Sequence, residues 1–96
     1  MTKKEILDKL NEKRDFIQKE YAVESIGLFG SYAKERQSDD SDIDFYVVFK
    51  NKTFDNLAGL WVYLEELYHK KIDIVHKHKH NNQLLIKQIK DEVVYG

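Results

Sequence analysis

The feature that most constrains the fold is a glycine–serine pair followed, at a fixed distance, by two aspartates. An apolar run ends in Gly30 and Ser31, and after ten further residues Asp42 and Asp44 open a second apolar run. Glycine and serine at the end of a strand let backbone N–H groups approach a phosphate closely. Carboxylates two residues apart on a strand share a face, roughly 7 Å apart along the chain, and can hold hard divalent cations. We therefore expect a phosphate-binding turn beside a metal site.

The composition is typical of a small globular domain. The 96 residues suffice for one hydrophobic core, so residues 1–96 are expected to form a single domain. The formal net charge of −1 predicts no general attraction to nucleic acid or to a membrane surface. Cysteine is absent, which excludes disulfides and thiolate metal sites, and no apolar run approaches the roughly 18 residues of a membrane span. We expect a soluble, cytoplasmic protein.

The spacing of apolar residues predicts three helices and one short helical turn. The first helix runs from about Lys3 to Glu20, the short turn covers residues 31–34, and two further helices follow later in the chain. Their expected N-caps are Thr2 in a capping box with Glu5, then Asp55, then Asn81 or Asn82. Apolar residues expected to pack from the later helices include Trp61, Leu85 and Ile89.

Three strands are predicted, over residues 23–29, 42–49 and 71–75. Both faces of the second strand turn apolar beyond Asp44, which is typical of a central strand with its carboxylates at one exposed end. Residues 37–41 are expected to be a loop, and residues 93–95 an edge strand or a docked tail. This order predicts the α+β class, an α/β sandwich in which a small mixed sheet is flanked by helices.

Asp73 is an acid inside the third predicted strand, where aspartate is disfavoured. If that strand lies beside the second, Asp42, Asp44 and Asp73 converge, and their mutual repulsion is relieved by bound cations. Mg²⁺ suits a few hard oxygen ligands, and two ions about 3.5–4 Å apart serve phosphoryl or nucleotidyl transfer. Gly30 and Ser31 would then hold phosphates, Lys34 would balance their charge, and Asp73 could accept the proton of an attacking hydroxyl.

Gly30-Ser31, ten residues, then Asp42-Ile43-Asp44 resembles the signature of the DNA polymerase β-type nucleotidyltransferase superfamily. The segments Gly-Ser-Tyr-Ala-Lys and Ser-Asp-Ile-Asp resemble those of its minimal members, the MNT proteins. The resemblance extends over essentially the whole chain. The resemblance implies that Asp42, Asp44 and Asp73 ligate Mg²⁺ and act in catalysis. It also implies that Gly30 and Ser31 contact the triphosphate of ATP, and Lys34 and Ser41 are further candidates for nucleotide binding. Glu35 departs from the family pattern, which commonly has glycine there, and a positive φ would strain it.

The same resemblance implies a partner protein. MNT proteins are typically encoded beside an HEPN-domain protein, and in several such toxin–antitoxin pairs the MNT protein transfers AMP from ATP to a tyrosine of the HEPN ribonuclease. Larger relatives carry an extra helical domain that holds a small-molecule acceptor, for which 96 residues leave no room. A protein acceptor is therefore expected, and the resemblance leaves an oligomer open.

Two alternatives remain at this stage. A nucleotidyltransferase fold could neutralise a toxin by occlusion without turnover, which Glu35 and exposed aromatic residues would favour; the candidates are Tyr46, Tyr63 and Tyr95. Transfer to RNA or to a small molecule is supported only by a basic patch formed by Lys70, Lys71, Lys77 and Lys79, against the net acidity of the rest.

The alternating histidines of residues 76–80 could bind Zn²⁺ or Ni²⁺ in an extended segment. The interleaved lysines would repel a cation, and no carboxylate is near in sequence. We interpret the run as a solvated exit from the third strand.

Overall fold

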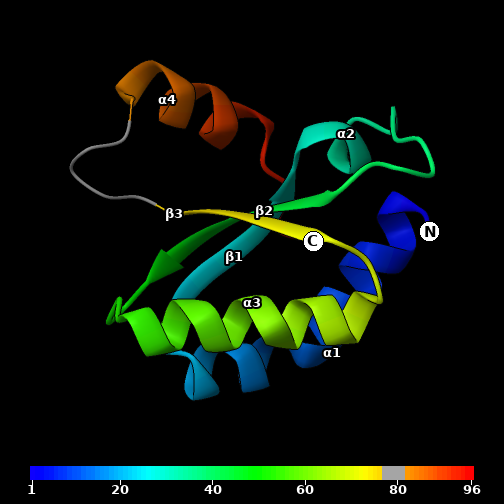
Figure 1. Ribbon diagram of the computed structural model, residues 1–96. Helices are drawn as coiled ribbons and strands as arrows, with labels where there is room; N and C mark the ends of the chain where they lie inside the picture. The colour runs from blue at the N-terminus through cyan, green and yellow to red at the C-terminus, as the bar shows by residue number, and fades with distance from the viewer. Residues whose placement is uncertain (77–81) are drawn as a thin grey trace.

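The computed structural model describes residues 1–76 and 82–96. The elements in chain order are α1 (Lys3–Glu20), β1 (Val23–Phe29), α2 (Gly30–Ala33), β2 (Ile43–Phe49), α3 (Phe54–Tyr68), β3 (Ile72–His76) and α4 (Gln83–Glu92). The strands form one sheet in the order β1–β2–β3, with β1 antiparallel and β3 parallel to β2. The predicted α+β class and the small mixed sheet between helices are confirmed (Figure 1).

Each long helix begins at a side chain that accepts hydrogen bonds from its first turn. At α1, Thr2 and Glu5 form the predicted capping box, and at α4 the Asn82 side chain accepts from two backbone N–H groups. The predicted cap of α3 is wrong: Thr53 Oγ1 accepts from the Asn56 N–H at 3.0 Å. Asp55 lies inside the first turn, where its negative charge complements the helix dipole.

The sheet separates two hydrophobic clusters because side chains alternate along each strand. Alternate residues of β2 (Ile43, Phe45 and Val47) pack in the larger cluster with buried residues of α1 and α3. Tyr46, on the opposite face of β2, packs in the smaller cluster with Ile86 of α4. Figure 1 shows α1 and α3 below the sheet and α4 with α2 above it. The first face is thus a full core, and the second is covered by one helix and the chain end.

Both edges of the described sheet are capped, which limits pairing with other chains. On the β1 side, Leu28 and Val94 exchange two backbone hydrogen bonds of 2.8 Å, so the predicted tail docks as a single bridge. Arg14 of α1 donates to the Ile26 carbonyl at 2.9 Å on the same edge. On the β3 side, the Trp61 Nε1–H donates to the Ile72 carbonyl at 2.9 Å. Trp61 packs against the larger cluster, as predicted.

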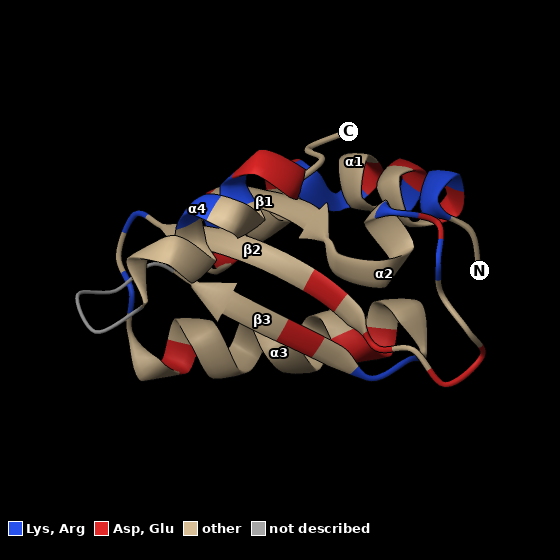
Figure 2. Cartoon of the chain, turned by 90° about the horizontal axis from the view of Figure 1, so that it is seen from above, with Lys and Arg blue, Asp and Glu red and all other residues tan. Residues whose placement is uncertain are grey.

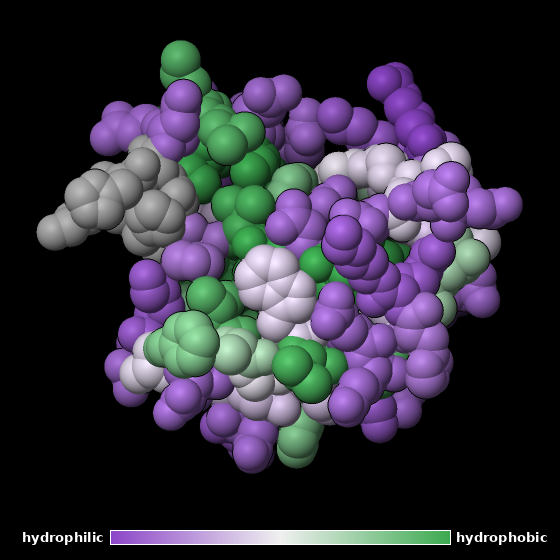
Figure 3. Space-filling model, in the orientation of Figure 1, coloured by the Kyte–Doolittle hydropathy of each residue, from purple (hydrophilic) through white to green (hydrophobic). Residues whose placement is uncertain are grey.

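Other differences from the predictions are local. Tyr46 is 1% exposed, so it offers no surface to a partner, because β2 is central and α4 covers it. The buried residues of α4 are Ile86 and Ile89, whereas Leu85, which was predicted to pack, is 50% exposed. Apolar side chains gather over α4, where Leu84 is 80% exposed (Figure 3).

The element boundaries shift by a residue, with α2 starting at Gly30, β2 at Ile43 and β3 at Ile72. His76 ends β3, whereas Lys77, His78, Lys79, His80 and Asn81 lie outside the described residues. None of the described helices combines the length and the apolar character needed to cross a membrane.

Candidate functional site

The parallel pairing of β2 and β3 brings two of the predicted aspartates side by side. Asp44 lies in register with Asp73, and on its other side it pairs with Phe29, the last residue of β1. Paired positions share a face, so both carboxylates project on the side of the sheet that α4 covers. Figure 2 shows the two acidic positions next to each other on the sheet. Asp42 directly precedes β2, at the same end of the strand.

Gly30 brings the glycine–serine turn against this acidic pair. Its φ is +77°, in the left-handed region that favours glycine, and a Cβ added there would overlap the Asp44 carboxylate. The backbone of the turn and the side chain of Asp44 are therefore in direct contact. Two parts of the motif that are far apart in sequence meet here because β1 and β2 are antiparallel neighbours.

Asp44 has a raised pKa in this cluster. Burial, then the charge of Asp73, then that of Asp42 raise its pKa from 3.8 to about 6. Burial is the largest cause because the turn at Gly30 packs against the half-buried Asp44 side chain. The charges of Asp73 and Asp42 thus act on Asp44 in the direction that the predicted repulsion between these carboxylates requires.

The donor chemistry of the cluster fits Mg²⁺, which prefers hard carboxylate oxygens and relief of like-charge repulsion. Asp42, Asp44 and Asp73 are the residues that would hold it. Within residues 1–76 and 82–96, no three acidic or histidine side chains are already gathered as a ligand set. The structure thus pairs two of the three aspartates, Asp44 and Asp73, and the charge of the third, Asp42, acts on Asp44. The three carboxylates do not form a ready-made set of metal ligands.

The raised pKa of Asp44 predicts a pH dependence of folding in metal-free solution. Between pH ~4 and ~6 the folded carboxyl holds its proton more tightly than the unfolded one, so stability falls as pH rises. The shift of about two pKa units corresponds to roughly 3 kcal/mol, which partial exposure of Asp44 reduces to about 1–2 kcal/mol. Urea unfolding across this range should show the fall in the parent and a smaller one in Asp44→Asn. Asp39→Asn, in the exposed loop, should keep it; an equal fall in Asp44→Asn would contradict the assignment.

The short helix α2 carries the remaining candidate nucleotide residues. Ser31 is its second residue, and Lys34 ends it with an N–H that donates to the Gly30 carbonyl at 3.1 Å. The Lys34 ammonium pairs with Glu92 of α4 at 3.0 Å. This partner is 58 residues away in sequence, and no local pattern signals it.

Ser41 closes the loop before β2. Its hydroxyl accepts from the Ser38 N–H at 2.9 Å, and its own N–H donates to the Ser38 carbonyl at 3.1 Å. These bonds fix the backbone that delivers Asp42. Ser41 is thus engaged in the turn itself, and its contact with a nucleotide stays a prediction.

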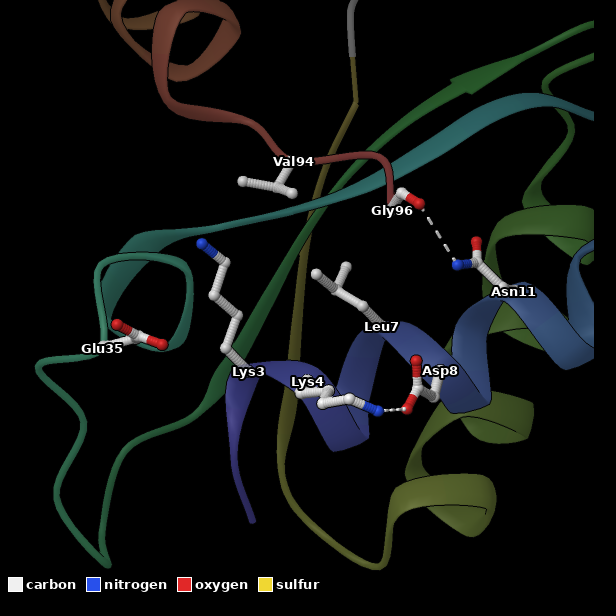
Figure 4. Close-up of a pocket in the computed structure, with 8 residues that line it drawn as sticks. All are labelled: Lys3, Lys4, Leu7, Asp8, Asn11, Glu35, Val94 and Gly96. Atoms are coloured by element: carbon white, nitrogen blue, oxygen red, sulfur yellow. Dashed lines mark hydrogen bonds and ion pairs between the residues drawn. The ribbon is translucent and has the colours of Figure 1, made fainter.

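Glu35 occupies the left-handed region, with φ of +57°. The strain expected of a non-glycine residue at this position is therefore present. Its side chain lines a pocket with Lys3, Lys4 and Val94, formed by α1, the loop after α2 and the chain end (Figure 4). The expected effect of its charge on nucleotide binding stays a prediction.

Replacing Glu35 by glycine should stabilise the fold. Relief of the left-handed strain, about 1–2 kcal/mol, exceeds the entropy that glycine adds to the unfolded chain, about 0.4–1 kcal/mol. We expect the free energy of unfolding to rise by about 0.5–1 kcal/mol in urea titrations. Glu35→Gln, which removes the charge and keeps the strain, is the matched control. A gain in Glu35→Gln as large as in Glu35→Gly would assign the effect to charge.

Lys70 is the part of the predicted basic patch that the structure ties to this site. Its ammonium lies 6.0 Å from the centre of the Tyr32 ring and 3.4 Å from the Asp39 carbonyl oxygen. Lys71 is exposed, and its carbonyl accepts from the Ile43 N–H at 3.1 Å at the same end of the sheet. Both lysines therefore border the aspartates, while Lys77 and Lys79 lie outside the described residues.

Comparison with known proteins finds nucleotidyltransferases that are similar to this chain in sequence. The family model described as polymerase beta, nucleotidyltransferase, matches residues 11–96. A candidate protein adenylyltransferase of Methanocaldococcus jannaschii is 34% identical over 97 residues, which cover 98% of this chain and 97% of that protein. The protein adenylyltransferase MntA of Thermococcus cleftensis is 31% identical over 96 residues, covering 99% of this chain and 96% of that protein.

Solved structures agree with the fold. A structure described as a candidate minimal nucleotidyltransferase aligns with a TM-score of 0.76 and 26% identity, covering 98% of this chain and 95% of that one. A chain of the Shewanella oneidensis complex of a tri-AMPylated HEPN toxin with its MNT antitoxin aligns with a TM-score of 0.59 and 20% identity, covering 86% and 65%. With the turn at Gly30 and the aspartates of β2 and β3 in place, this chain belongs to the polymerase beta nucleotidyltransferase family, a family of enzymes.

Proposed function

We propose that the chain is a Mg²⁺-dependent adenylyltransferase that transfers AMP from ATP to a hydroxyl group, that of a tyrosine, on a partner protein. The observation that carries the proposal is the packing of Gly30 against Asp44, which is itself in register with Asp73. A backbone turn suited to phosphates thereby lies beside the carboxylates suited to a cation. We further propose that residues 1–96 act as one domain and that the protein works in the cytoplasm, where ATP is available.

The reaction needs the acceptor oxygen to form a bond to the α-phosphorus of ATP while the bond to the β-phosphate bridging oxygen breaks. Pyrophosphate leaves, and the hydroxyl proton must be accepted. Asp73 is our candidate for this proton because it is exposed next to the more buried Asp44. Gly30 and Ser31 would hold the β- and γ-phosphates, Lys34 would balance their charge, and Ser41 would support the loop. Mg²⁺, when bound, would stabilise the charge that develops on the phosphate oxygens.

The names of similar proteins support a protein acceptor. Both relatives described above carry adenylyltransferase names in which the substrate is a protein. The solved Shewanella complex pairs an MNT antitoxin with an AMPylated HEPN toxin. We propose by analogy that this chain acts as the antitoxin of an HEPN-type toxin by modifying it.

Occlusion of the toxin without turnover is the second candidate. The strained Glu35 favours it, as do exposed residues that a partner could cover, such as Tyr95 at 44% and Leu84 at 80% exposure. Calorimetry with ATP and Mg²⁺ separates the two functions, since an occluding protein needs no nucleotide.

The proposal is tested by following the label of ATP into a co-purified HEPN-like partner. Label at the α-phosphate should appear on the partner, and label at the γ-phosphate should not, because pyrophosphate is released. Chelation of divalent cations should stop the transfer. Transfer of the γ-label would indicate a kinase, and no transfer together with toxin neutralisation would indicate occlusion.

A further inference from the structure

The ion pair between Lys34 and Glu92 connects the phosphate turn to the last residue of α4. Its nitrogen–oxygen distance is 3.0 Å, and the two side chains are 43% and 27% exposed. The other ion pairs of the described residues, Lys4–Asp8 and Lys13–Glu12, join neighbours on α1 and are more exposed overall. Of these three pairs, the Lys34–Glu92 pair alone joins residues that are distant in sequence.

The backbone holds Glu92 at this place. The antiparallel bridge between Leu28 and Val94 docks the chain end on β1, two residues before Gly30 and two residues after Glu92. Gly27 provides the room, because a Cβ there would meet a Val93 methyl at 2.5 Å and the Tyr95 ring at 2.9 Å. Figure 1 shows the end of α4 and the segment after it passing beside α2.

We propose that Glu92 is a built-in competitor of the nucleotide phosphates for Lys34, so that the end of α4 sets the affinity of the site for ATP. The inference rests on the proposed function, in which Lys34 balances the triphosphate charge. In the nucleotide-free protein the ammonium is bound by the carboxylate. A triphosphate must displace Glu92 from Lys34, and the negative charge of the displaced Glu92 carboxylate then repels the negatively charged phosphates.

The physical basis is an exchange of partners. A half-exposed ion pair is weak, so phosphates carrying several charges displace the carboxylate at a modest cost. That cost appears as weaker binding and not as a slower chemical step, because Glu92 contacts Lys34 and none of the three aspartates in the described contacts. Glu92 is accordingly a positioning residue that acts through Lys34. The affinity for nucleotide then depends on whether the end of α4 and the tail are docked.

The test measures binding of a non-hydrolysable ATP analogue with Mg²⁺ by calorimetry. Glu92→Gln should lower Kd about three-fold or more, in line with the loss of a surface ion pair that competes for Lys34. Asp91→Asn, an equal change of charge on the neighbouring exposed residue, should leave Kd within about two-fold. In turnover assays Glu92→Gln should lower the KM for ATP and leave kcat unchanged.

A Lys34→Met background separates partner exchange from simple repulsion at a distance. Glu92→Gln should have little effect on Kd there, because no ammonium remains to be released. An unchanged or raised Kd in Glu92→Gln alone, or the same decrease in both backgrounds, would overturn the inference and leave the proposed function standing. Absence of nucleotide binding by the parent protein would overturn both. Urea unfolding of each variant checks that the tail is still docked.

Discussion

Replacing Asp42 and Asp44 together with asparagine is expected to abolish transfer of the α-phosphate label from ATP to the partner protein. Asparagine keeps the size of each side chain and removes the charges that would hold a divalent cation. Loss of several kcal/mol of charge stabilisation in the transition state corresponds to a decrease of about 10³-fold or more in kcat/KM. Because Asp44 is charged at a cost in the folded state, as its raised pKa shows, the same change should not destabilise the protein.

The matched control is the replacement of both Asp39 and Asp40 by asparagine, since these two residues are exposed in the loop before β2. It removes the same number of charges a few residues away, so it reports the general effect of charge on ATP or partner binding. We expect this control to retain transfer within about three-fold of the parent, as for surface charges outside a site. Persistent transfer in the Asp42 and Asp44 variant, or equal loss in the control, would refute the role of these carboxylates.

Gly30→Ala is expected to damage both the fold and the site. Alanine at a φ of +77° is strained by about 1–3 kcal/mol, and its Cβ must push the Asp44 carboxylate aside. Overpacking of this kind costs about 1–3 kcal/mol, so the two effects together should lower the free energy of unfolding by about 2–6 kcal/mol. Transfer activity should fall with it, since the Asp44 carboxylate is displaced from its position in the candidate site.

Combining Gly30→Ala with Asp44→Ala separates the two causes. The shorter side chain leaves room for the new methyl group, so the double variant should recover the overpacking term and retain only the backbone strain, about 1–3 kcal/mol. Urea unfolding of the parent, both single variants and the double variant gives the coupling energy. Strict additivity of the two single effects would show that Gly30 is needed only for its backbone conformation and not for its contact with Asp44.

This contact gives the glycine of the motif a second physical role. Glycine is expected at a phosphate turn because it lets backbone N–H groups approach a ligand. Here it also lets the turn approach the carboxylate that burial drives toward protonation. Shielding from water raises the pKa of Asp44, and a cation held by Asp42, Asp44 and Asp73 would reverse that unfavourable balance. The close packing of the turn is therefore linked to the pKa of Asp44, and a change at Gly30 is expected to alter that pKa.

Local sequence signals predicted most of the elements that carry the site. The capping box at Thr2, the helical spacing through Glu20 and the alternation along β2 are each confirmed within a residue of the predicted boundary. These features depend on neighbours a few residues apart, which a sequence shows directly. The N-cap of α3 is the exception: Thr53 and Asp55 are both good caps, and the choice between them depends on how the chain leaves β2.

Residues that depend on long-range packing could not be assigned from the sequence. Tyr46 was expected to be exposed, and it is buried because α4 packs on that face of the sheet. Likewise, the ion pair of Lys34 joins residues from opposite ends of the chain, which only the docking of the tail on β1 brings together.

Residue types and their spacing alone identified the residues of the candidate site: a glycine–serine turn, two aspartates ten residues later, and a third aspartate inside a later strand. Residue type and spacing along one strand suffice for that, because side-chain direction alternates with a fixed period. The pairing of β2 with β3, which no local pattern predicts, places Asp44 beside Asp73, and the packing of the fold partly buries Asp44. Strand order and register are set by burial of both faces of β2, and this is a property of the whole fold.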